Sequence, residues 1–273
     1  MIKKLFCACI YLYQGSAVRN LQDHTVVDND AARLAAYYCN NNADRIIVFD
    51  QSNTDEEHEL ALDTIKKIAI ACEVPVIGAG NVKRMEDVKK LLYAGCAKAV
   101  LNYSKESNIE ITEEVSQKFG KSKILVSYTD TGSLEAHKDL LKEYVSELIC
   151  LDKNQVKNNT GIPTICSLEK ATPEEAKEIL LTDHVSGLTG NVINDTIEDT
   201  FSQKISLAKE GVLVSACEAA MKWSDFKLNS DQMLPVIVQD YKTNEVLMMA
   251  YMNEEAYNLS LIHISEPTRH SLI

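Results

Sequence analysis

The sequence predicts an α/β protein, a (β/α)8 TIM-like barrel followed by a truncated β-rich module. Short β-branched, apolar runs alternate with amphipathic helical stretches along most of the 273 residues. Eight such β-then-α units with short connections predict a parallel sheet, and eight strands close this kind of barrel. An open, doubly wound sheet is the alternative. No Gly-x-Gly-x-x-Gly follows the first strand, so its dinucleotide-binding form lacks support.

Eight apolar runs are expected to form the strands of the barrel. They lie at residues 5–12, 45–50, 75–78, 99–102, 124–127, 148–152, 163–166 and 185–188. The first run follows two lysines and superficially resembles a short signal peptide. Because it is rich in β-branched and aromatic residues and ends at Gln14-Gly15, we interpret it as a buried strand.

Helical patterns lie between these runs, at residues 57–71, 85–94, 134–145 and 173–181. The last of them has a clear start, because Thr172 can cap it, Pro173 fits its first turn and two glutamates complement the helix dipole. Gly95 and Gly211 each follow a helical pattern and are typical of helix ends.

The chain divides into a barrel at residues 1–210, a helical connector at 211–232 and a second module from 233. The connector is apolar and rich in small residues as far as Trp223, which we expect to anchor it by packing. It then turns polar, so we place the domain boundary near Asn229.

The second module is expected to begin with a β-hairpin. Apolar runs at 236–240 and 246–251 flank Thr243-Asn244, which suits a turn, and Asn253 then begins a helix. The apolar face and free edge of such a hairpin would tend to be sticky.

Composition limits the classes of function. The formal net charge of −12 argues against a nucleic-acid-binding surface, since such a surface needs a basic patch. No segment reaches the roughly 18 apolar residues that span a bilayer, so we expect no membrane partner. The eight cysteines form no Cys-x-x-Cys pair and lie mostly in apolar runs, which is typical of reduced, cytoplasmic protein. A metal held by Cys7, Cys9 and His24 is the disfavoured alternative to core packing.

Two stretches carry a resemblance to known barrels. Residues 75–87, PVIGAGNVKRMED, with 92–102 after them, and residues 9–19, CIYLYQGSAVR, resemble the histidine-biosynthesis barrels. These are the cyclase subunit of imidazole glycerol phosphate synthase and its isomerase relative. The resemblance covers residues 1 to about 210. It implies a TIM barrel that acts on a phosphorylated aminoimidazole precursor with two carboxylates at the ends of strands one and five.

This chain departs from that pair of carboxylates. The position on strand one is Tyr11, and the position on strand five is Thr129, with Asp130 one residue later. Because a shift of one residue in a strand reverses the side-chain direction, Asp130 is a weak candidate for the catalytic group. We therefore expect the ordinary chemistry of the family to be lost.

Phosphate binding is expected at small residues near the strand ends. The candidates are Gly78, Gly80, Asn102, Gly187 and Gly190, although the glycines can also serve only as tight turns. After strand seven the resemblance implies a Ser-Gly-Gly turn, but this chain has Ser167-Leu168-Glu169, and a glutamate there would repel phosphate.

Other polar candidates have simpler interpretations. Asp50 ends strand two, where the resemblance also implies an aspartate, but it can simply cap the next turn. Histidines 24, 58, 137 and 184 have no ligand spacing and are expected on the solvated surface.

Residues 233–257 resemble the opening of phosphoribosyl-AMP cyclohydrolase, a hydrolase of histidine biosynthesis. The matching residues are Leu234-Pro235, Val238-Gln-Asp240 and Glu245 to Asn253. The resemblance implies zinc, with magnesium assisting, in a homodimeric enzyme. The metal ligands of that family lie downstream, and no cysteine or histidine occurs from Met233 to Asn258, so we expect no metal site within these residues. Residues 259–269, LSLIHISEPTR, resemble a translated sequencing adapter, and 259–273 are expected to be an artefactual tail.

Three hypotheses follow for function. The main one is a histidine-biosynthesis protein in which a degenerate barrel precedes a truncated phosphoribosyl-AMP cyclohydrolase domain at 233–258, possibly with a phosphoribosyl-ATP pyrophosphohydrolase further on. The second makes the barrel itself an active isomerase or cyclase on a phosphoribosyl-aminoimidazole compound. The third makes it a non-catalytic scaffold or a sensor of a phosphorylated metabolite.

Overall fold

The computed structural model describes residues 2–156, 160–215, 221–240 and 243–257. The chain divides into two units, Met1–Ser215 and Ala216–Ile273, which are described separately. The expected tail at 259–273 lies outside the described residues.

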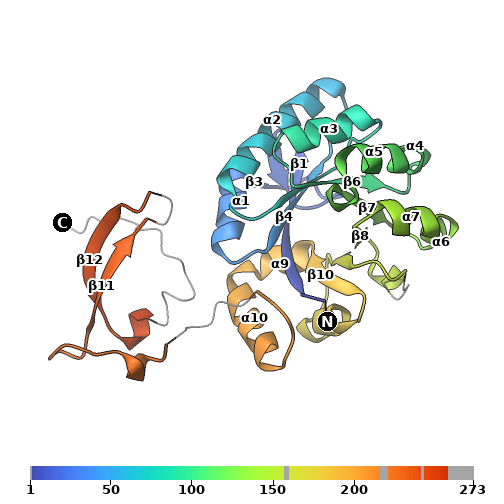
Figure 1. Ribbon diagram of the computed structural model, residues 1–273. Coiled ribbons are helices and arrows are strands. Elements are labelled where there is room, and N and C mark those ends of the chain that lie inside the picture. Colours follow the sequence, from blue (N-terminus) through green and yellow to red (C-terminus); the bar gives the residue numbers. More distant parts are fainter. Residues whose placement is uncertain (1, 157–159, 216–220, 241–242, 258–273) are drawn as a thin grey trace. The chain divides into compact units, whose positions relative to one another are not determined.

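The first unit is a closed barrel of eight parallel strands (Figure 1), which confirms the predicted fold. In spatial order they are β1 (Leu5–Tyr13), β4 (Arg45–Asp50), β5 (Val76–Ala79), β6 (Lys98–Asn102), β7 (Ile124–Tyr128), β8 (Glu147–Cys150), β9 (Thr164–Ser167) and β10 (Val185–Thr189). Pairing of β10 with β1 closes the ring. That last ladder is short, with Leu5 opposite Gly187 and Phe6 opposite Leu188.

The helices surround this ring of strands (Figure 1). They are α1 (Ala31–Asn40), α2 (Asp55–Ala71), α3 (Met85–Tyr93), α4 (Glu106–Glu110), α5 (Thr112–Phe119), α6 (Gly132–Ala136), α7 (Lys138–Tyr144), α8 (Pro173–Leu181), α9 (Asn191–Asp195) and α10 (Thr200–Lys209). Local sequence fixes several starts. Thr54 and Glu57 form a capping box at α2, and Thr172 accepts a hydrogen bond from the Glu175 N–H at α8.

One predicted helix is interrupted. Residues 134–145 contribute to two short helices, α6 and α7, which meet at His137. The Nδ1 atom of His137 lies 2.9 Å from the Ser133 carbonyl oxygen, which a continuous helix would offer to the His137 N–H. The imidazole therefore competes with the backbone for this acceptor.

An antiparallel hairpin beside β1 was not predicted. Its strands are β2 (Ser16–Val18) and β3 (Val26–Asp28), and β2 pairs with the end of β1. Gln14 and Gly15, with φ of 48° and 82°, make the turn into it. The connection between β2 and β3 reaches the end of β4, where the Asn20 carbonyl accepts a hydrogen bond from Gln51 Nε2 at 3.3 Å.

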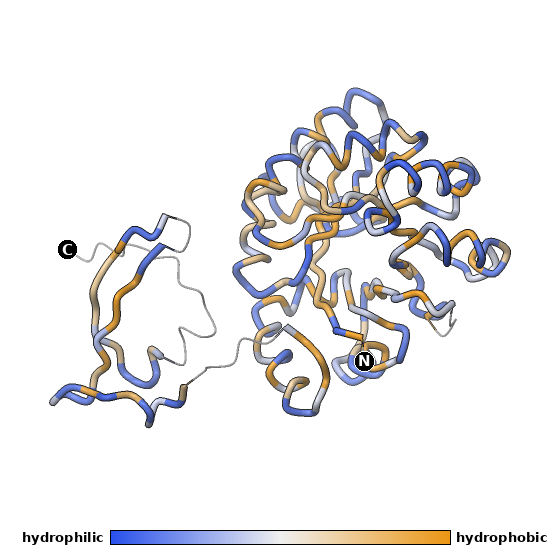
Figure 2. Tube along the Cα trace, viewed as in Figure 1, coloured by the Kyte–Doolittle hydropathy of each residue, from blue (hydrophilic) through white to orange (hydrophobic). Residues whose placement is uncertain are grey.

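Side chains alternate along the strands between the barrel interior and the layer under the helices. The helices cover a large apolar layer, visible as orange segments on the strands and on one side of the helices in Figure 2. The interior holds a second, smaller cluster: Cys7, Cys9, Tyr11, Val18, Ile47, Phe49, Ile77, Ala79, Val100, Leu125, Ile149 and Ile165. Within each of these strands, every second residue therefore faces the interior.

Three charged residues occupy the interior at the amino ends of the strands. Arg45, Lys98 and Glu147 begin β4, β6 and β8. Glu147 accepts two hydrogen bonds from Arg45, at 2.5 and 3.2 Å, and one from Lys98 at 2.9 Å. Burial alone would raise the pKa of Glu147, but these two cations outweigh burial and lower the pKa below its ordinary value.

The predicted helical connector at 211–232 is wrong for its described residues. After a turn at Gly211, Val214 forms a parallel bridge to Lys4, and the Leu213 carbonyl accepts from the Lys4 N–H at 2.8 Å. In 221–232 the structure describes one 3₁₀ turn, Trp223–Asp225. The segment after Gly211 forms backbone hydrogen bonds with Lys4 at the start of the barrel. Helix propensity alone does not predict such long-range bonds.

The second unit holds the expected β-hairpin. Its strands are β11 (Leu234–Gln239) and β12 (Val246–Met252), paired antiparallel from Leu234 opposite Met252. The Asp240 N–H donates to the Glu245 carbonyl at 2.9 Å beside the turn. Large apolar side chains lie exposed on it, Ile237 at 67% and Met249 at 65%. As expected, Trp223 packs, here against the rings of Phe226 and Tyr257.

Candidate functional site at the barrel mouth

The carboxyl ends of the eight strands meet at one end of the barrel, which we call the mouth and where barrels of this kind bind their ligands. A cavity of about 240 Å³ opens there over β4, β5, β6, β7 and β8. We call it the β4–β8 cavity. The residues that line it are Leu21, Phe49, Asp50, Gln51, Ser52, Ala79, Gly80, Asn81, Val82, Val100, Asn102, Lys105, Asn108, Ser127 and Leu151.

Gly80 brings the backbone close to its neighbour at this cavity. Its φ is +93°, and a Cβ atom there would overlap the Asp50 carbonyl, so the position requires glycine. Asn81 follows with φ of 50°, and its Nδ2 donates to the Ser52 carbonyl at 2.9 Å. The turns after β4 and β5 are thereby joined.

The turn after β6 supplies polar groups to the same cavity. Asn102 Oδ1 accepts from the Ser104 N–H at 2.9 Å, and no described residue accepts a hydrogen bond from Asn102 Nδ2. Lys105 is exposed, and its ammonium group forms no ion pair with a described residue. Buried Asn108 fixes this turn by accepting from the Asn102 N–H at 3.1 Å and donating to the Val82 carbonyl at 2.9 Å.

Asp50 is a structural residue at the cavity wall. Its carboxylate accepts hydrogen bonds from the Ser52 N–H and hydroxyl, as the capping interpretation expects, and contacts His58 Nδ1 at 2.5 Å. Burial would raise the pKa of Asp50, but the His58 and Ser52 hydrogen bonds lower it overall. The expectation of a surface His58 is wrong, since the side chain is buried against this carboxylate.

His184 is also buried rather than solvated, because its Nε2 bonds to the Val156 carbonyl at 2.6 Å. Of the remaining two, His24 is exposed and stacks on Tyr13, with ring centroids 3.9 Å apart, and His137 is half-buried beside the Ser133 carbonyl.

The carboxylates implied for strands one and five are missing from the mouth. Tyr11 points into the barrel interior and is buried against Phe49. In β7, Leu125 faces the interior, so alternation directs Thr129 inward and Asp130 away from it. Asp130 accepts a hydrogen bond from the Gly132 N–H at 2.7 Å, which ties it to the start of α6. The Asp130 carboxylate thus bonds to its own turn in the chain.

The five predicted phosphate residues divide into two groups. Gly80, Asn102 and Gly190 lie at the mouth. Gly78 lies within β5, where a Cβ would crowd Leu91 and Cys96, and Gly187 lies within β10 against the backbone of Leu5. These last two glycines serve strand and helix packing.

The other side of the mouth contains a carboxylate. The ends of β9 and β10 lie four strands away from those of β5 and β6, on the opposite side of the ring. Glu169 follows β9 and accepts from the Tyr11 hydroxyl at 3.2 Å and from Asn191 Nδ2 at 2.6 Å. Burial raises the pKa of Glu169, opposed by the hydrogen bonds from Tyr11 and Asn20.

Residues 6–187, more than half of the chain, match the family described as "Histidine biosynthesis protein". The chain belongs to the histidine biosynthesis protein family. The chain is 26% identical to imidazole glycerol phosphate synthase subunit HisF of Staphylococcus saprophyticus subsp. saprophyticus over 249 residues, covering 77% of this chain and 98% of that protein. Proteins of the same description from Staphylococcus aureus strains JH9 and Newman are 31% identical over 128 residues, 46% of this chain and 51% of theirs.

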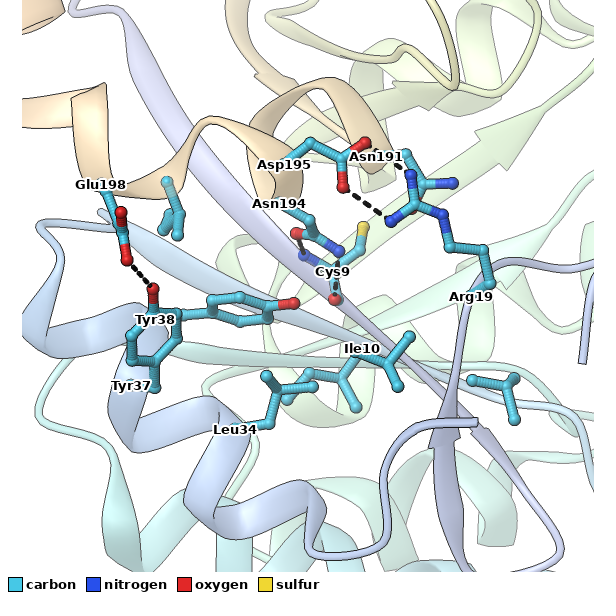
Figure 3. A pocket seen from close by; sticks show the side chains of 13 residues that line it. Cys9, Ile10, Arg19, Leu34, Tyr37, Tyr38, Asn191, Asn194, Asp195 and Glu198 are labelled. Carbon is cyan, nitrogen blue, oxygen red and sulfur yellow. Dashed lines mark hydrogen bonds and ion pairs between the residues drawn. The ribbon is translucent and has the colours of Figure 1, made fainter. Parts of the chain in front are cut away.

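This histidine-biosynthesis barrel has a second cavity, of about 350 Å³, between β1, α1 and α9 (Figure 3). At one side of it, Arg19 and Asp195 form a bidentate ion pair, with N–O distances of 2.6 and 2.5 Å. At the other side, the Tyr37 hydroxyl donates to the Glu198 carboxylate. Between them, Asn194 contacts β1, donating to the Cys9 carbonyl and accepting from the Cys9 N–H, each at 2.9 Å. The charges of Arg19 and Asp195 thus compensate each other, and the Glu198 carboxylate accepts from the neutral Tyr37 hydroxyl.

Within the described ranges, no three His, Cys, Asp or Glu side chains lie together as a metal would need, and no helix is long and apolar enough to cross a membrane.

The residues that the sequence interpretation missed are Lys105, Asn191 and the pairing of Tyr11 with Glu169. Lys105 follows Asn102 closely, so its position was an available signal. Tyr11 and Glu169 are 158 residues apart, and no sequence pattern joins them.

Proposed function

We propose that the barrel acts in histidine biosynthesis by binding a phosphorylated aminoimidazole compound at the β4–β8 cavity, with cyclase- or isomerase-type chemistry. The observation that carries the proposal is the convergence of Gly80, Asn102 and Lys105 on one cavity of a histidine-biosynthesis barrel. Curated relatives described as a synthase subunit support the same class of reaction.

The chemistry of the cavity suits a phosphate. A phosphate oxygen needs N–H donors and positive charge, and Asn102 Nδ2 and the Lys105 ammonium can supply both. The one carboxylate on the cavity wall, Asp50, is fully buried and already bonded to His58 and Ser52. It therefore presents little negative charge to a ligand.

A second candidate function is phosphometabolite sensing without turnover. The observation that favours it is the loss of both strand carboxylates, since Tyr11 occupies one position and Asp130 turns away from the other. A ligand can bind at such a mouth although acid–base groups on these two strands are missing.

Purified full-length chain tests both candidates. We expect phosphorylated aminoimidazole precursors to raise the unfolding temperature, and Lys105→Gln to weaken their binding about tenfold, because it removes one charge-assisted contact. Lys138→Gln, at an exposed lysine of α7, is the matched control. Turnover by the wild type supports the enzyme, and binding without turnover supports the sensor. No binding of any precursor contradicts both.

The second unit is the subject of a separate proposal. We propose that residues 233–258 begin a phosphoribosyl-AMP cyclohydrolase module in a cytoplasmic homodimer, on the sequence resemblance alone. The described residues do not fit the zinc and magnesium that this activity implies, since 221–240 and 243–257 contain neither cysteine nor histidine. Ring opening of phosphoribosyl-AMP by the full-length chain would support the proposal, and light scattering that finds only monomer would contradict the homodimer.

A further inference from the structure

We propose that Glu169 determines substrate specificity by acting as a built-in anion on the β9–β10 side of the mouth. The ligand would then carry one phosphate, held at the β4–β8 cavity, and a cationic or hydrogen-bond-donating group at its other end. This inference rests on the proposed function and names the class of ligand that the site takes.

The first step is the position of the carboxylate. Tyr11 faces the barrel interior from β1, and its hydroxyl donates to Glu169 Oε1. Asn191, at the turn after β10, holds Oε2. Donors from two neighbouring parts of the ring therefore orient one carboxylate at the mouth, while the residue remains exposed enough to meet a ligand.

The second step is the occupancy of the donors on this side. Asn191 is buried, and its side-chain Nδ2 donates a hydrogen bond to Glu169. The turn of Gly190 lies directly against Leu168, which donates its N–H to the Thr189 carbonyl at 2.8 Å and accepts from the Val192 N–H at 3.0 Å. The Leu168 and Val192 N–H groups already have acceptors, and the Arg19 guanidinium is paired with Asp195.

The third step is the contrast between the two sides. The β4–β8 cavity offers the unpaired Lys105 ammonium and Asn102 amide, whereas the opposite side offers a carboxylate. A second phosphate placed there would meet like charge in a partly desolvated site. Repulsion of this kind corresponds to roughly a tenfold to hundredfold loss of affinity. An ammonium or a donor N–H would instead gain a charge-assisted contact.

The test uses two matched probes on the full-length chain: an α,ω-alkanediol bisphosphate and the ω-aminoalkyl phosphate of equal length, in a series of lengths. Isothermal titration calorimetry gives both affinities. We expect the wild type to prefer the aminoalkyl phosphate at least about tenfold at the best length, Glu169→Gln to bring the ratio near one, and Tyr11→Phe, which keeps the charge, to retain the preference.

Glu135→Gln, at an exposed glutamate of α6, removes one negative charge elsewhere and should leave the ratio unchanged. Equal or tighter binding of the bisphosphate to the wild type overturns the inference, whether or not the variants fold, and leaves the proposed function standing. A ratio that Glu135→Gln changes as much as Glu169→Gln does also overturns it. If neither probe binds the wild type, the proposed function fails and the inference fails with it.

Discussion

The side-chain amide of Asn194 takes the place of a strand partner for Cys9. The β10–β1 ladder pairs only Leu5 and Phe6, so further along β1 the backbone needs another source of hydrogen bonds. Asn194 supplies both a donor and an acceptor, and the Cys9 thiol meets the Thr189 hydroxyl at 2.8 Å. Burial raises the pKa of Cys9 to about 11, although the Thr189 hydrogen bond lowers it in part, so the thiol stays protonated and unreactive at neutral pH.

Replacing Asn194 with alanine should therefore destabilise the barrel. The change leaves the Cys9 N–H and carbonyl without their partner, and we expect a loss of about 2–4 kcal/mol in the free energy of unfolding. Urea denaturation followed by circular dichroism measures it. Asn53→Ala, at an exposed asparagine before α2, is the control. Equal stability of the two variants would show that water replaces the Asn194 amide.

Glu147 makes the stability of the barrel depend on pH. Its pKa is lowered in the folded state, so the ionised form stabilises the fold. This contribution is fully present above the ordinary value of 4.5 and is lost as the pH falls through the lower folded pKa. At neutral pH, the free energy of unfolding of the wild type should exceed that of Glu147→Gln by about 1–3 kcal/mol. This difference should shrink as the pH falls through the acidic window. Denaturation curves at several pH values measure this, and a difference that grows on acidification would contradict it.

At the scale of elements, α10 is fastened to the amino ends of β1 and β4 by a buried ion pair. Lys204 lies 2.8 Å from Asp44, donates to the Asn42 carbonyl at 2.7 Å, and lies over the Phe6 ring. Asp44 also accepts from the Phe6 N–H at 2.8 Å. The last helix of the barrel, α10, is thus joined to the two adjacent barrel strands β1 and β4.

Lys204→Met should loosen this helix strongly. Methionine keeps much of the side-chain volume but leaves Asp44 buried without its cation, and we expect a loss of about 3–5 kcal/mol. Lys209→Met, at an exposed lysine of the same helix, controls for the change of charge. Hydrogen exchange should show the α10 amides losing protection first. Uniform loss across the barrel would contradict a local fastening.

The elements that could be predicted are those with a strong periodic signal. A local sequence signal marks the eight apolar strands, the helices capped by Thr54 and Thr172, and the terminal hairpin. The β2–β3 hairpin could not be predicted, because three-residue strands carry no period. The break at His137 depends on one competing hydrogen bond, and the non-helical course after Gly211 depends on the pairing of Val214 with Lys4, far away in the sequence.

The site was predictable to a similar degree. Gly80 follows β5, Asn102 ends β6, and both were expected at the mouth, while strand parity predicted the outward direction of Asp130. The burial of His58 and the pairing of Glu169 with Asn191 and Tyr11 arise from separate loops that only the closed ring brings together.

At the scale of the whole molecule, the barrel contains its own core, and the hairpin unit exposes apolar side chains. We expect residues 1–215 alone to unfold within about 2 °C of the barrel transition in the full chain, because a separate domain contributes little to that transition. They should also self-associate less, since β11 and β12 are absent. Calorimetry and light scattering measure the two effects.

A matched full-length variant, Ile237→Lys with Met249→Lys, should reduce self-association in the same way while leaving the barrel transition unchanged. A large drop in the melting temperature of residues 1–215 would mean that the second unit supports the barrel. That result would contradict the independence of the two units.

The short seam between β10 and β1 also sets an order of events during synthesis. Cys9 and Asn194 are 185 residues apart, so the first strand emerges long before its partner exists. Until then, the backbone of Cys9 faces water or a transient neighbour, and ring closure is a late, long-range step of the kind that slows folding. The nascent barrel is therefore an open, curved sheet in which one edge of the first strand has no partner, and that edge is what a chaperone or an aggregating neighbour would meet.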